Sequence, residues 1–252
     1  MPLAVLLISL HARELGTSLL TLGSGALIYI FLLYPAGLWI VSSFRRPRTV
    51  QPSTRSRVTL IISAHNEGAG IRKKLEDTLG LNYPREKLQI LVVSDGSTDA
   101  TDAIVSEFAG CGVELLRIPQ RGGKTQAQNI AVTSARHEIL VFSDATTLFH
   151  PLALQYLVGV YDDLRVGAAS GRYQYFDPTR ISPTAGGTIA FWNFENRIKQ
   201  MQSRIFSITG CCGCIYSVRR SLYTDLPANI ISDLVQPLHV LLQGFTVHFE
   251  AR

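Results

Sequence analysis

Two short aliphatic runs, Gln89-Ile-Leu-Val-Val-Ser-Asp95 and Glu138-Ile-Leu-Val-Phe-Ser-Asp144, each end on an aspartate and lead into small polar residues. A short aliphatic run bounded by turn residues is typical of a strand that is buried on both faces of a parallel sheet. Ligands of such sheets bind beyond the carboxyl ends of the strands. We therefore expect one aspartate to meet a nucleotide and the other to hold a divalent metal against its phosphates.

The same alternation extends on both sides of these runs and predicts an α/β fold. Its sheet should be Rossmann-like and mostly parallel, with helices on both faces, because strands and helices alternate as β-α-β-α-β-α-β. The predicted strands are Val58–Ser63, Gln89–Ser94, Val113–Ile118 and Glu138–Ser143, and the predicted helices are Gly70–Leu79, Asp99–Ala109 and Lys124–Arg136.

The pattern after Asp144 is looser, but it still predicts further elements. Helices are expected over Pro151–Leu164, over the amphipathic stretch Gly187–Phe206, and over Asp233–Gln243. Strands are expected over Val166–Tyr175 and Phe245–Phe249, and a Gly- and Cys-rich strand or loop over Ile208–Val218.

The N-terminal segment predicts a membrane anchor. Of the 252 residues, 46% are hydrophobic and 17% charged, and Leu15–Phe44 carries no charge at all. About 20 apolar residues span a bilayer, and Pro35 and Gly37 would bend such a helix without excluding it. A secretory signal peptide is the alternative, but no Lys or Arg precedes the first apolar run. We therefore expect an anchor over residues 1–44 with its span at 15–44, a linker over 45–57, and a catalytic domain over 58–252.

Basic residues gather directly after this span, and they predict its orientation. By the positive-inside rule the cluster places residues 45–252 in the cytoplasm of a single-pass protein of the cell membrane. The net charge of +5 comes largely from this cluster, which favours contact with lipid headgroups over nucleic acid. Its members are Arg45, Arg46, Arg48, Arg55 and Arg57.

The four cysteines do not form a recognisable metal motif. Cys211, Cys212 and Cys214 lie together, but Cys111 is distant and no histidine has the spacing of a zinc ligand. In a cytoplasmic domain we interpret all four as small buried thiols and not as disulfides.

Five blocks in a fixed order resemble the inverting family 2 glycosyltransferases of the GT-A fold, in their membrane-anchored bacterial form. The resemblance extends from Val58 almost to the end of the chain. The blocks are Ser63-Ala-His-Asn-Glu67, Ser94-Asp-Gly-Ser-Thr-Asp99, Gly123-Lys-Thr-Gln-Ala-Gln-Asn129, Ser143-Asp-Ala-Thr-Thr147 and Ile231-Ser-Asp233.

The resemblance implies a donor site for a nucleotide-sugar. It places Glu67 near the ribose or base, Asp95 on the base, where a carboxylate accepts a uracil N–H, and Lys124 near the phosphates. Each residue also has a simpler structural interpretation. Glu67 could be an exposed loop carboxylate, and Lys124 a solvated lysine at the start of a helix. Asp95 could belong to a turn or cap a helix, although Asp99 fits that role better. Ile118 stands where a P-loop needs glycine, so Gly122-Gly-Lys124 is not one.

Asp144-Ala-Thr146 occupies the place of the family's Asp-x-Asp motif, whose carboxylates hold Mg²⁺ or Mn²⁺ as hard oxygen ligands. Asp144 is therefore the expected metal ligand. Thr146 replaces the second aspartate; its hydroxyl can orient a metal-bound water or touch a phosphate, but it brings no charge.

Asp233 matches the family's catalytic base, which an inverting transfer needs on the acceptor hydroxyl. The alternative is a helix N-cap. Glu195, Arg197 and Arg204 fall, with Gly210–Tyr216, where such enzymes shape the acceptor channel, although the same helix would also suit a membrane interface.

These features predict a glycosyltransferase that moves a sugar from a nucleotide-sugar, most simply a UDP-sugar, to a polysaccharide or lipid-linked acceptor with inversion. Two alternatives remain: transfer to a polyprenyl phosphate, and a catalytically weakened donor-binding subunit. The Gln-x-x-Arg-Trp motif of processive members is absent. Because the chain stops at Arg252, we expect either a fragment or a short form with an incomplete acceptor site.

Overall fold

The computed structural model describes residues 3–46, 49–174 and 185–252. It divides into two compact units, residues 1–46 and 47–252. Two predicted features lie outside the described residues: Arg48 of the basic linker, and Tyr175 at the end of a predicted strand.

The first unit is one helical segment made of α1 (Leu3–Ile28), a π-helical turn (Tyr29–Leu33) and α2 (Tyr34–Ser43). Pro35 has no amide hydrogen, and its ring crowds the preceding turn, so a widened turn directly before it accommodates the proline. The helical stretch Arg13–Ser43 is 31 residues long and contains an 18-residue window with a mean hydropathy of 1.8. By length and composition this helix can cross a membrane, as predicted for Leu15–Phe44. The orientation stays a prediction.

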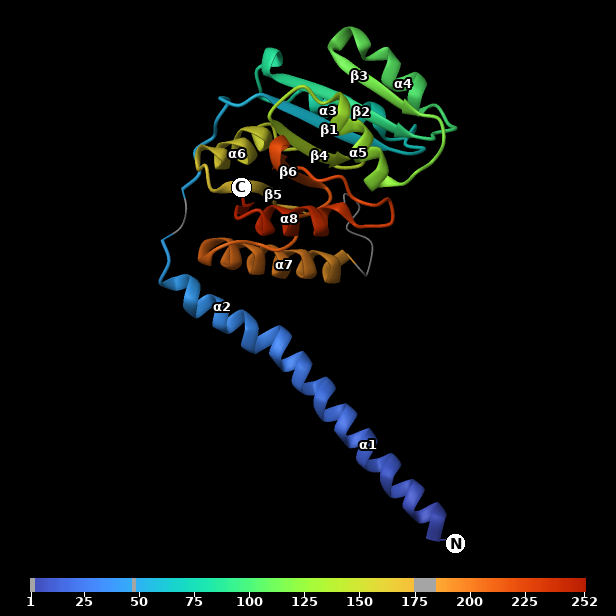
Figure 1. The fold of residues 1–252 in the computed structure, drawn as a ribbon, viewed down its shortest axis with the longest axis vertical. Helices are drawn as coiled ribbons and strands as arrows, with labels where there is room; N and C mark the ends of the chain where they lie inside the picture. The colour runs from blue at the N-terminus through green and yellow to red at the C-terminus, as the bar shows by residue number, and fades with distance from the viewer. Residues whose placement is uncertain (1–2, 47–48, 175–184) are drawn as a thin grey trace. The chain divides into compact units, whose positions relative to one another are not determined.

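In the second unit, the described residues form a seven-stranded sheet in the order β3-β2-β1-β4-β6-β5-β7 (Figure 1). Neighbouring strands are parallel from β3 to β4, β6 is antiparallel to both of its neighbours, and β7 is parallel to β5. The predicted, mostly parallel sheet is confirmed. The strands are β1 (Val58–Ala64), β2 (Leu88–Asp95), β3 (Val113–Ile118), β4 (Ile139–Asp144), β5 (Val166–Gly171), β6 (Ile215–Arg219) and β7 (Thr246–Glu250).

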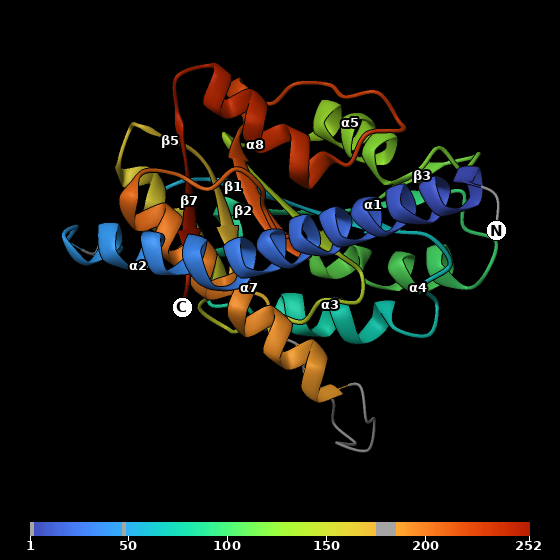
Figure 2. The same ribbon diagram turned by 90° about the horizontal axis from the view of Figure 1, so that it is seen from below.

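Helices cover both faces of the sheet, also as predicted. Figure 2 shows α5 (Lys124–Ser134) and α8 (Ser232–Leu242) on one side of the strands, and α3 (Ile71–Leu79) and α4 (Thr101–Glu107) on the other. The central strands divide their side chains between two cores: Leu60 and Ile62 of β1 pack with α3, whereas Ile61 packs with α5. This two-sided burial is the reason that the strands are aliphatic throughout.

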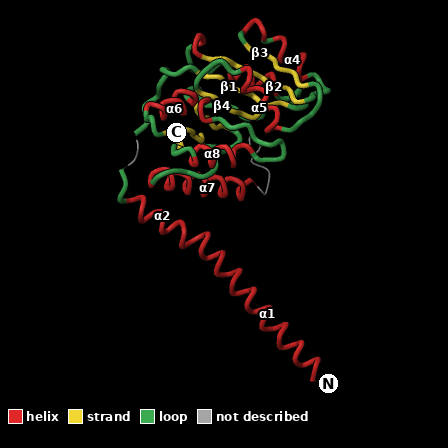
Figure 3. Tube along the Cα trace, in the orientation of Figure 1, coloured by secondary structure: helices red, strands yellow, loops and turns green. Residues whose placement is uncertain are grey.

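The outer part of the unit differs in detail from the prediction. The helix expected from Pro151 begins later, as α6 (Ala153–Gly159), and continues as a 3₁₀ turn over Val160–Asp162. The helix α7 spans Ala185–Ile205. Of the stretch Ile208–Val218, the part before β6 is a loop, visible in green in Figure 3. A turn closed by the Ile215 N–H and the Cys212 carbonyl leads from this loop into β6.

The helical first unit yields a prediction about membrane association. The unaltered chain should stay in the membrane pellet after an alkaline carbonate wash, because the helical stretch Arg13–Ser43 is long and apolar enough to span a bilayer. A variant lacking residues 1–46 should be released and keep its melting temperature, since the second unit has its own core. Release of the full-length chain, or cleavage of its N-terminus in cells, would contradict the anchor.

Candidate active site

Asp95 and Asp144 lie at the same edge of the sheet. The strand β1 lies between β2 and β4 and is parallel to both, with Ala64 beside Ser94 and Ser63 beside Asp144. Both aspartates therefore lie at the carboxyl ends of neighbouring strands, where open α/β sheets bind ligands. This placement was predicted from the two aliphatic runs.

Asp95 anchors the loop that leads into α5. Its side chain is nearly buried, and its two oxygens accept hydrogen bonds from the backbone N–H groups of Gly122 and Gly123, each at 2.8 Å. Gly96 has a φ of 63°, and a side chain there would come within 2.6 Å of the Arg121 nitrogen, so the turn requires glycine. Asp95 therefore stabilises a turn. A contact with a nucleotide base would use the carboxylate lone pairs that these two hydrogen bonds leave free.

Lys124 reaches from the start of α5 across the sheet edge. Its Nζ lies 2.5 Å from Asp144 Oδ1 and donates to the Gly213 carbonyl at 3.2 Å. The two side chains are 38% and 33% exposed, so this charge-assisted pair is partly shielded from water. Lys124 is exposed at the start of α5, as the alternative of a solvated lysine has it, but its ammonium is paired; its role toward a donor stays a prediction.

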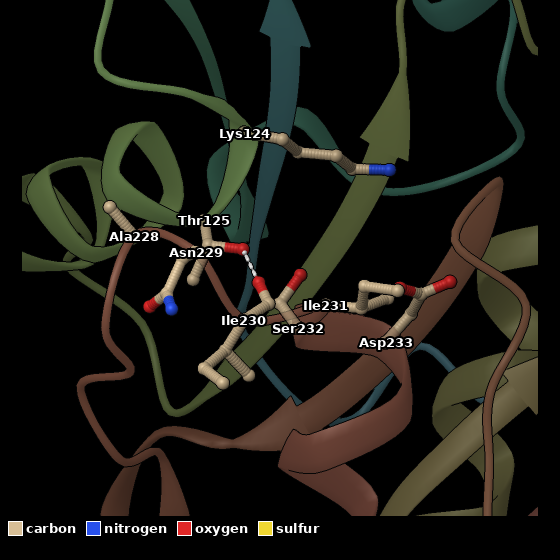
Figure 4. Close-up of a pocket in the computed structure, with 8 residues that line it drawn as sticks. All are labelled: Lys124, Thr125, Ala228, Asn229, Ile230, Ile231, Ser232 and Asp233. Atoms are coloured by element: carbon tan, nitrogen blue, oxygen red, sulfur yellow. Dashed lines mark hydrogen bonds between the residues drawn. The ribbon is translucent and has the colours of Figure 1, made fainter.

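Two side chains of α5 tie down the segment that leads to Asp233. Thr125 Oγ1 donates to the Ile230 carbonyl at 2.6 Å (Figure 4), and Asn129 Nδ2 donates to the Leu226 carbonyl at 2.7 Å. The N-cap of α8 is Ile231, without a side-chain capping bond, so the capping role for Asp233 is wrong. Asp233 instead lies in the first helical turn.

Gly213 brings Lys124 and Asp233 together. A methyl group built on Gly213 would lie 2.6 Å from Asp233 Oδ2 and 3.2 Å from Lys124 Nζ. The backbone at this position therefore lies against both a carboxylate and an ammonium, and a side chain there would displace the ends of these two side chains. Lys124, Asp144 and Asp233 form one cluster, which we call the acid–lysine cluster.

Two hollows meet at this cluster. One, of about 280 Å³, lies between the start of α5 and the segment before α8, and Figure 4 shows its lining from Lys124 to Asp233. The other, of about 400 Å³, is lined by Phe191, Trp192, Glu195 and Lys199 of α7 together with all three members of the acid–lysine cluster. Lys124 and Asp233 line both. Two molecules could therefore meet there, one in each hollow.

Lys74 of α3 was not predicted from the sequence to belong to the site, although its side chain contacts the loop that follows Asp144. Its side chain is fully buried, and its Nζ donates to Ser143 Oγ at 3.0 Å and to the Thr147 carbonyl at 2.5 Å. The ammonium also lies 3.6 Å from the centroid of the Phe149 ring. Burial lowers the pKa of Lys74 to about 7, while Asp77 and Asp144 favour the charged form. The sequence did contain a signal for this buried lysine: it lies three residues after Ile71, on the apolar face of the predicted helix.

Two predicted donor residues lie apart from the cluster. Glu67 is partly exposed on the loop after β1, where its backbone N–H donates to Thr101 Oγ1. Thr146 is exposed in the turn that directly follows β4. The described linings of the two hollows include neither residue, nor Asp95. Arg197 is exposed on α7, whereas Glu195 lies in the larger hollow, paired at 3.3 Å with Lys199.

Asp144 could bind a divalent metal only if a substrate supplied further ligands. Among the described residues, no group of three or more His, Cys, Asp or Glu side chains could hold a metal ion. Mg²⁺ is often held by one or two carboxylates together with substrate phosphates, and Asp144 offers one such carboxylate. The residues present therefore suit a metal that arrives with a diphosphate.

A comparison with family models identifies the chain. The model described as Glycosyl transferase family 2 matches residues 59–226, more than half of the sequence. The chain belongs to glycosyltransferase family 2. The matched range includes Glu67, Asp95, Lys124 and Asp144, and it ends before Asp233.

Similar proteins agree with this assignment. A probable glycosyltransferase, YdaM of Bacillus subtilis, is 29% identical over 90% of this chain and 57% of its own length. The poly-beta-1,6-N-acetyl-D-glucosamine synthase of Staphylococcus aureus is 22% identical over 87% of this chain and 58% of its own. The solved mannosyltransferase PcManGT from Pyrobaculum calidifontis, in complex with GDP-Man and Mn²⁺, has a TM-score of 0.74 and 25% identity, covering 88% of this chain and 64% of its own. The family 2 chain thus has the GT-A fold and spans about three fifths of the length of these relatives.

Asp95 gives a prediction about the loop before Lys124. Asp95→Asn should lower the free energy of unfolding by about 2 kcal/mol, because an amide nitrogen would face a backbone N–H that now donates to a charged oxygen. Urea denaturation measures the change. Glu107→Gln, which breaks an exposed ion pair with Arg72, is the control and should cost less than about 1 kcal/mol. Equal effects of the two substitutions would contradict the anchoring role of Asp95.

Lys74 gives a second prediction. Lys74→Met keeps the length of the side chain but removes both donors to the Asp144 loop, so binding of a nucleotide-sugar with Mn²⁺ should weaken about tenfold. Isothermal titration calorimetry provides the measurement. Lys73→Met, at the exposed neighbouring position, is the matched control and should bind as the unaltered chain does. Unchanged binding by Lys74→Met would mean that the loop holds its position without the lysine.

Proposed function

We propose that the chain transfers a sugar, with inversion, from a nucleotide-sugar to a polysaccharide or lipid-linked acceptor. The observation that carries the proposal is the acid–lysine cluster at the junction of two hollows. Membership of family 2 and the names of YdaM and the poly-N-acetylglucosamine synthase support it. A UDP-sugar is the simplest donor, and the GDP-Man bound by PcManGT makes a GDP-sugar the second donor to test.

On the donor side, the residues would act on the diphosphate. Asp144 would hold Mg²⁺ or Mn²⁺ together with phosphate oxygens, and the Thr146 hydroxyl lies on the same loop to orient a water or a phosphate. The metal would supply charge stabilisation to the leaving diphosphate. Lys124 would move its ammonium from Asp144 to the phosphate oxygens, the same kind of charge-assisted contact that it makes now. Asp95 keeps the loop before Lys124 in place.

On the acceptor side, Asp233 would be the base. It lies in the first turn of α8 and lines both hollows, so an acceptor in the larger hollow would be within its reach. Asp233 would take the proton of an acceptor hydroxyl while that oxygen bonds to the anomeric carbon and the bond to the diphosphate breaks. Attack from the face opposite the diphosphate inverts the configuration. Glu195 and Lys199, with Trp192, would then line the acceptor side.

The domain organisation is part of the same proposal. Residues 1–44 anchor the chain, residues 45–57 contact anionic headgroups, and residues 58–252 form the catalytic domain in the cytoplasm, where nucleotide-sugars are made. The hydropathy of Arg13–Ser43 and the arginines after it support this arrangement. Labelling of Cys111, an exposed thiol, by an impermeant maleimide in intact cells would contradict it.

Substitutions of the two carboxylates should have separable effects. Asp144→Asn should weaken Mn²⁺-dependent donor binding, because it removes the charged metal ligand. Asp233→Asn should leave donor binding nearly intact and lower turnover by ~10²–10⁴-fold, since a base acts on the acceptor. Thermal shift with UDP- and GDP-sugars and turnover of a radiolabelled donor by membranes are the two measurements. Asp225→Asn, at an exposed position before α8, is the control and should change neither.

The outcomes also decide between the alternatives. Turnover that survives Asp233→Asn would favour a polyprenyl phosphate acceptor, which is already ionised. Donor binding without turnover in the unaltered chain would favour a donor-binding subunit. If neither carboxylate substitution changed binding or turnover, the proposed site would be wrong.

Thr146 tests the metal motif from the other direction. Thr146→Asp restores a second carboxylate, and the dependence of donor binding on Mn²⁺ should become stronger because hard oxygen ligands favour this ion. Titration of Mn²⁺ at a fixed donor concentration measures the effect. A variant with the Mn²⁺ dependence of the unaltered chain would show that residue 146 does not reach the metal.

A further inference from the structure

Five acidic or basic side chains line the larger hollow, and four of them form two ion pairs. Lys124 pairs with Asp144 at 2.5 Å, and Lys199 pairs with Glu195 at 3.3 Å. Asp233 is the fifth, and it belongs to neither pair. The described lining therefore has three acidic and two basic side chains, a formal net charge of −1.

Lys199 is the cation that an incoming anion would meet in this hollow. Its side chain is 13% exposed, whereas that of Lys124 is 38% exposed and would turn to the diphosphate of the donor. Glu195 faces the Lys199 ammonium and is 35% exposed. Since charges that are shielded from water are screened less, Glu195 both neutralises Lys199 and repels a second anion.

Two aromatic rings of α7, those of Phe191 and Trp192, form the apolar part of the wall. The Trp192 ring makes a T-shaped contact with the Tyr173 ring, with 4.6 Å between the centroids. Asn196 is buried and holds this neighbour in place, because its Nδ2 donates to the Tyr173 carbonyl at 2.8 Å. A sugar ring can pack its C–H groups on the electron-rich face of an aromatic ring, while its hydroxyls bond to charged atoms beside it. Aromatic rings next to paired charges therefore suit a neutral sugar.

Three free thiols complete the wall and bring no positive charge. Cys211 and Cys212 are buried, as expected, and Cys214 is partly exposed. Cys111 is exposed at the end of the 3₁₀ turn before β3, which corrects the interpretation of all four cysteines as buried thiols. In the described lining, positive charge therefore comes from the two paired lysines alone.

We propose that the larger hollow binds a neutral sugar with a free hydroxyl, and that the Glu195–Lys199 pair excludes acceptors whose reacting group is a phosphate. A hydroxyl can donate to the Asp233 carboxylate, whereas an ionised phosphate would face a described lining that is net negative and whose cations are both paired. Such selectivity comes as much from repulsion of the wrong ligand as from contacts with the right one. The inference rests on the proposed function, and it selects a glycan acceptor over the polyprenyl phosphate.

Trp192 provides a direct measure of binding in this hollow. The chain has two tryptophans, Trp39 and Trp192, so Trp39→Phe leaves Trp192 as the single indole of the chain, studied in nanodiscs of neutral lipid. The probes are citronellyl β-glucoside, citronellyl β-N-acetylglucosaminide and citronellyl phosphate, which share one tail and differ in the head group. Both glycosides should change the Trp192 fluorescence to saturation. The phosphate should bind at least about tenfold more weakly, because like charges repel across the hollow.

Glu195→Gln, made in the Trp39→Phe chain, isolates the role of the ion pair. It keeps the size of the side chain but leaves Lys199 without its counter-charge, so the phosphate should bind about tenfold more tightly and the glycosides about as before. Asp225→Asn removes the same charge at an exposed position outside the described lining; as the matched control it should alter neither. Tighter binding of the phosphate than of the glycosides before the substitution, an unchanged preference after it, or no response to either glycoside overturns the proposal.

Transfer from a radiolabelled nucleotide-sugar to the same three probes separates this inference from the proposed function. The unaltered chain should transfer sugar to a glycoside at least about tenfold faster than to the phosphate. Transfer to the phosphate alone overturns the inference and leaves a glycosyltransferase with the alternative acceptor. If no probe accepts sugar, the proposed function fails, and the fluorescence titration still decides which head group the hollow binds.

Discussion

The ion pair between Lys124 and Asp144 is the interaction on which the rest of the site depends. It joins the start of α5 to the end of β4, and the carbonyl of Gly213 binds the same ammonium from the loop before β6. Three segments that are distant in the sequence therefore meet at one charged group. Because the ammonium and the carboxylate are each partly exposed, the proposed diphosphate and its metal could replace this pairing without a change of fold.

Each partner of the ion pair is held in place by a buried ionisable side chain. Asp95 fixes the loop before Lys124 through two backbone amides, and Lys74 fixes the loop after Asp144 through a hydroxyl and a carbonyl. Burying such a polar side chain is costly unless it is hydrogen-bonded, and both Asp95 and Lys74 are hydrogen-bonded here. Two buried ionisable side chains thus position two partly exposed charges, which is expected of a binding site and not of a surface salt bridge.

The sequence predicted the strands that carry Asp95 and Asp144 because each aliphatic run ends at its aspartate, and parallel strands then bring both ends to one edge. The sequence could not predict which groups these side chains would contact. No periodicity shows which amides Asp95 meets, and the cost of burying an ammonium argues against the core position of Lys74. The approach of Gly213 to Lys124 and Asp233 joins residues that only the folded chain brings together.

The most direct test of this account is the affinity of Lys124→Met for Mn²⁺ and for a nucleoside diphosphate, measured by calorimetry. Without nucleotide, the variant should bind Mn²⁺ more tightly than the unaltered chain, because the ammonium no longer competes for Asp144. With Mn²⁺ present, it should bind the nucleoside diphosphate more weakly, because the phosphates lose a cation. Two effects of opposite sign are predicted; changes in the same direction, or none, would contradict the ion pair as the centre of the site.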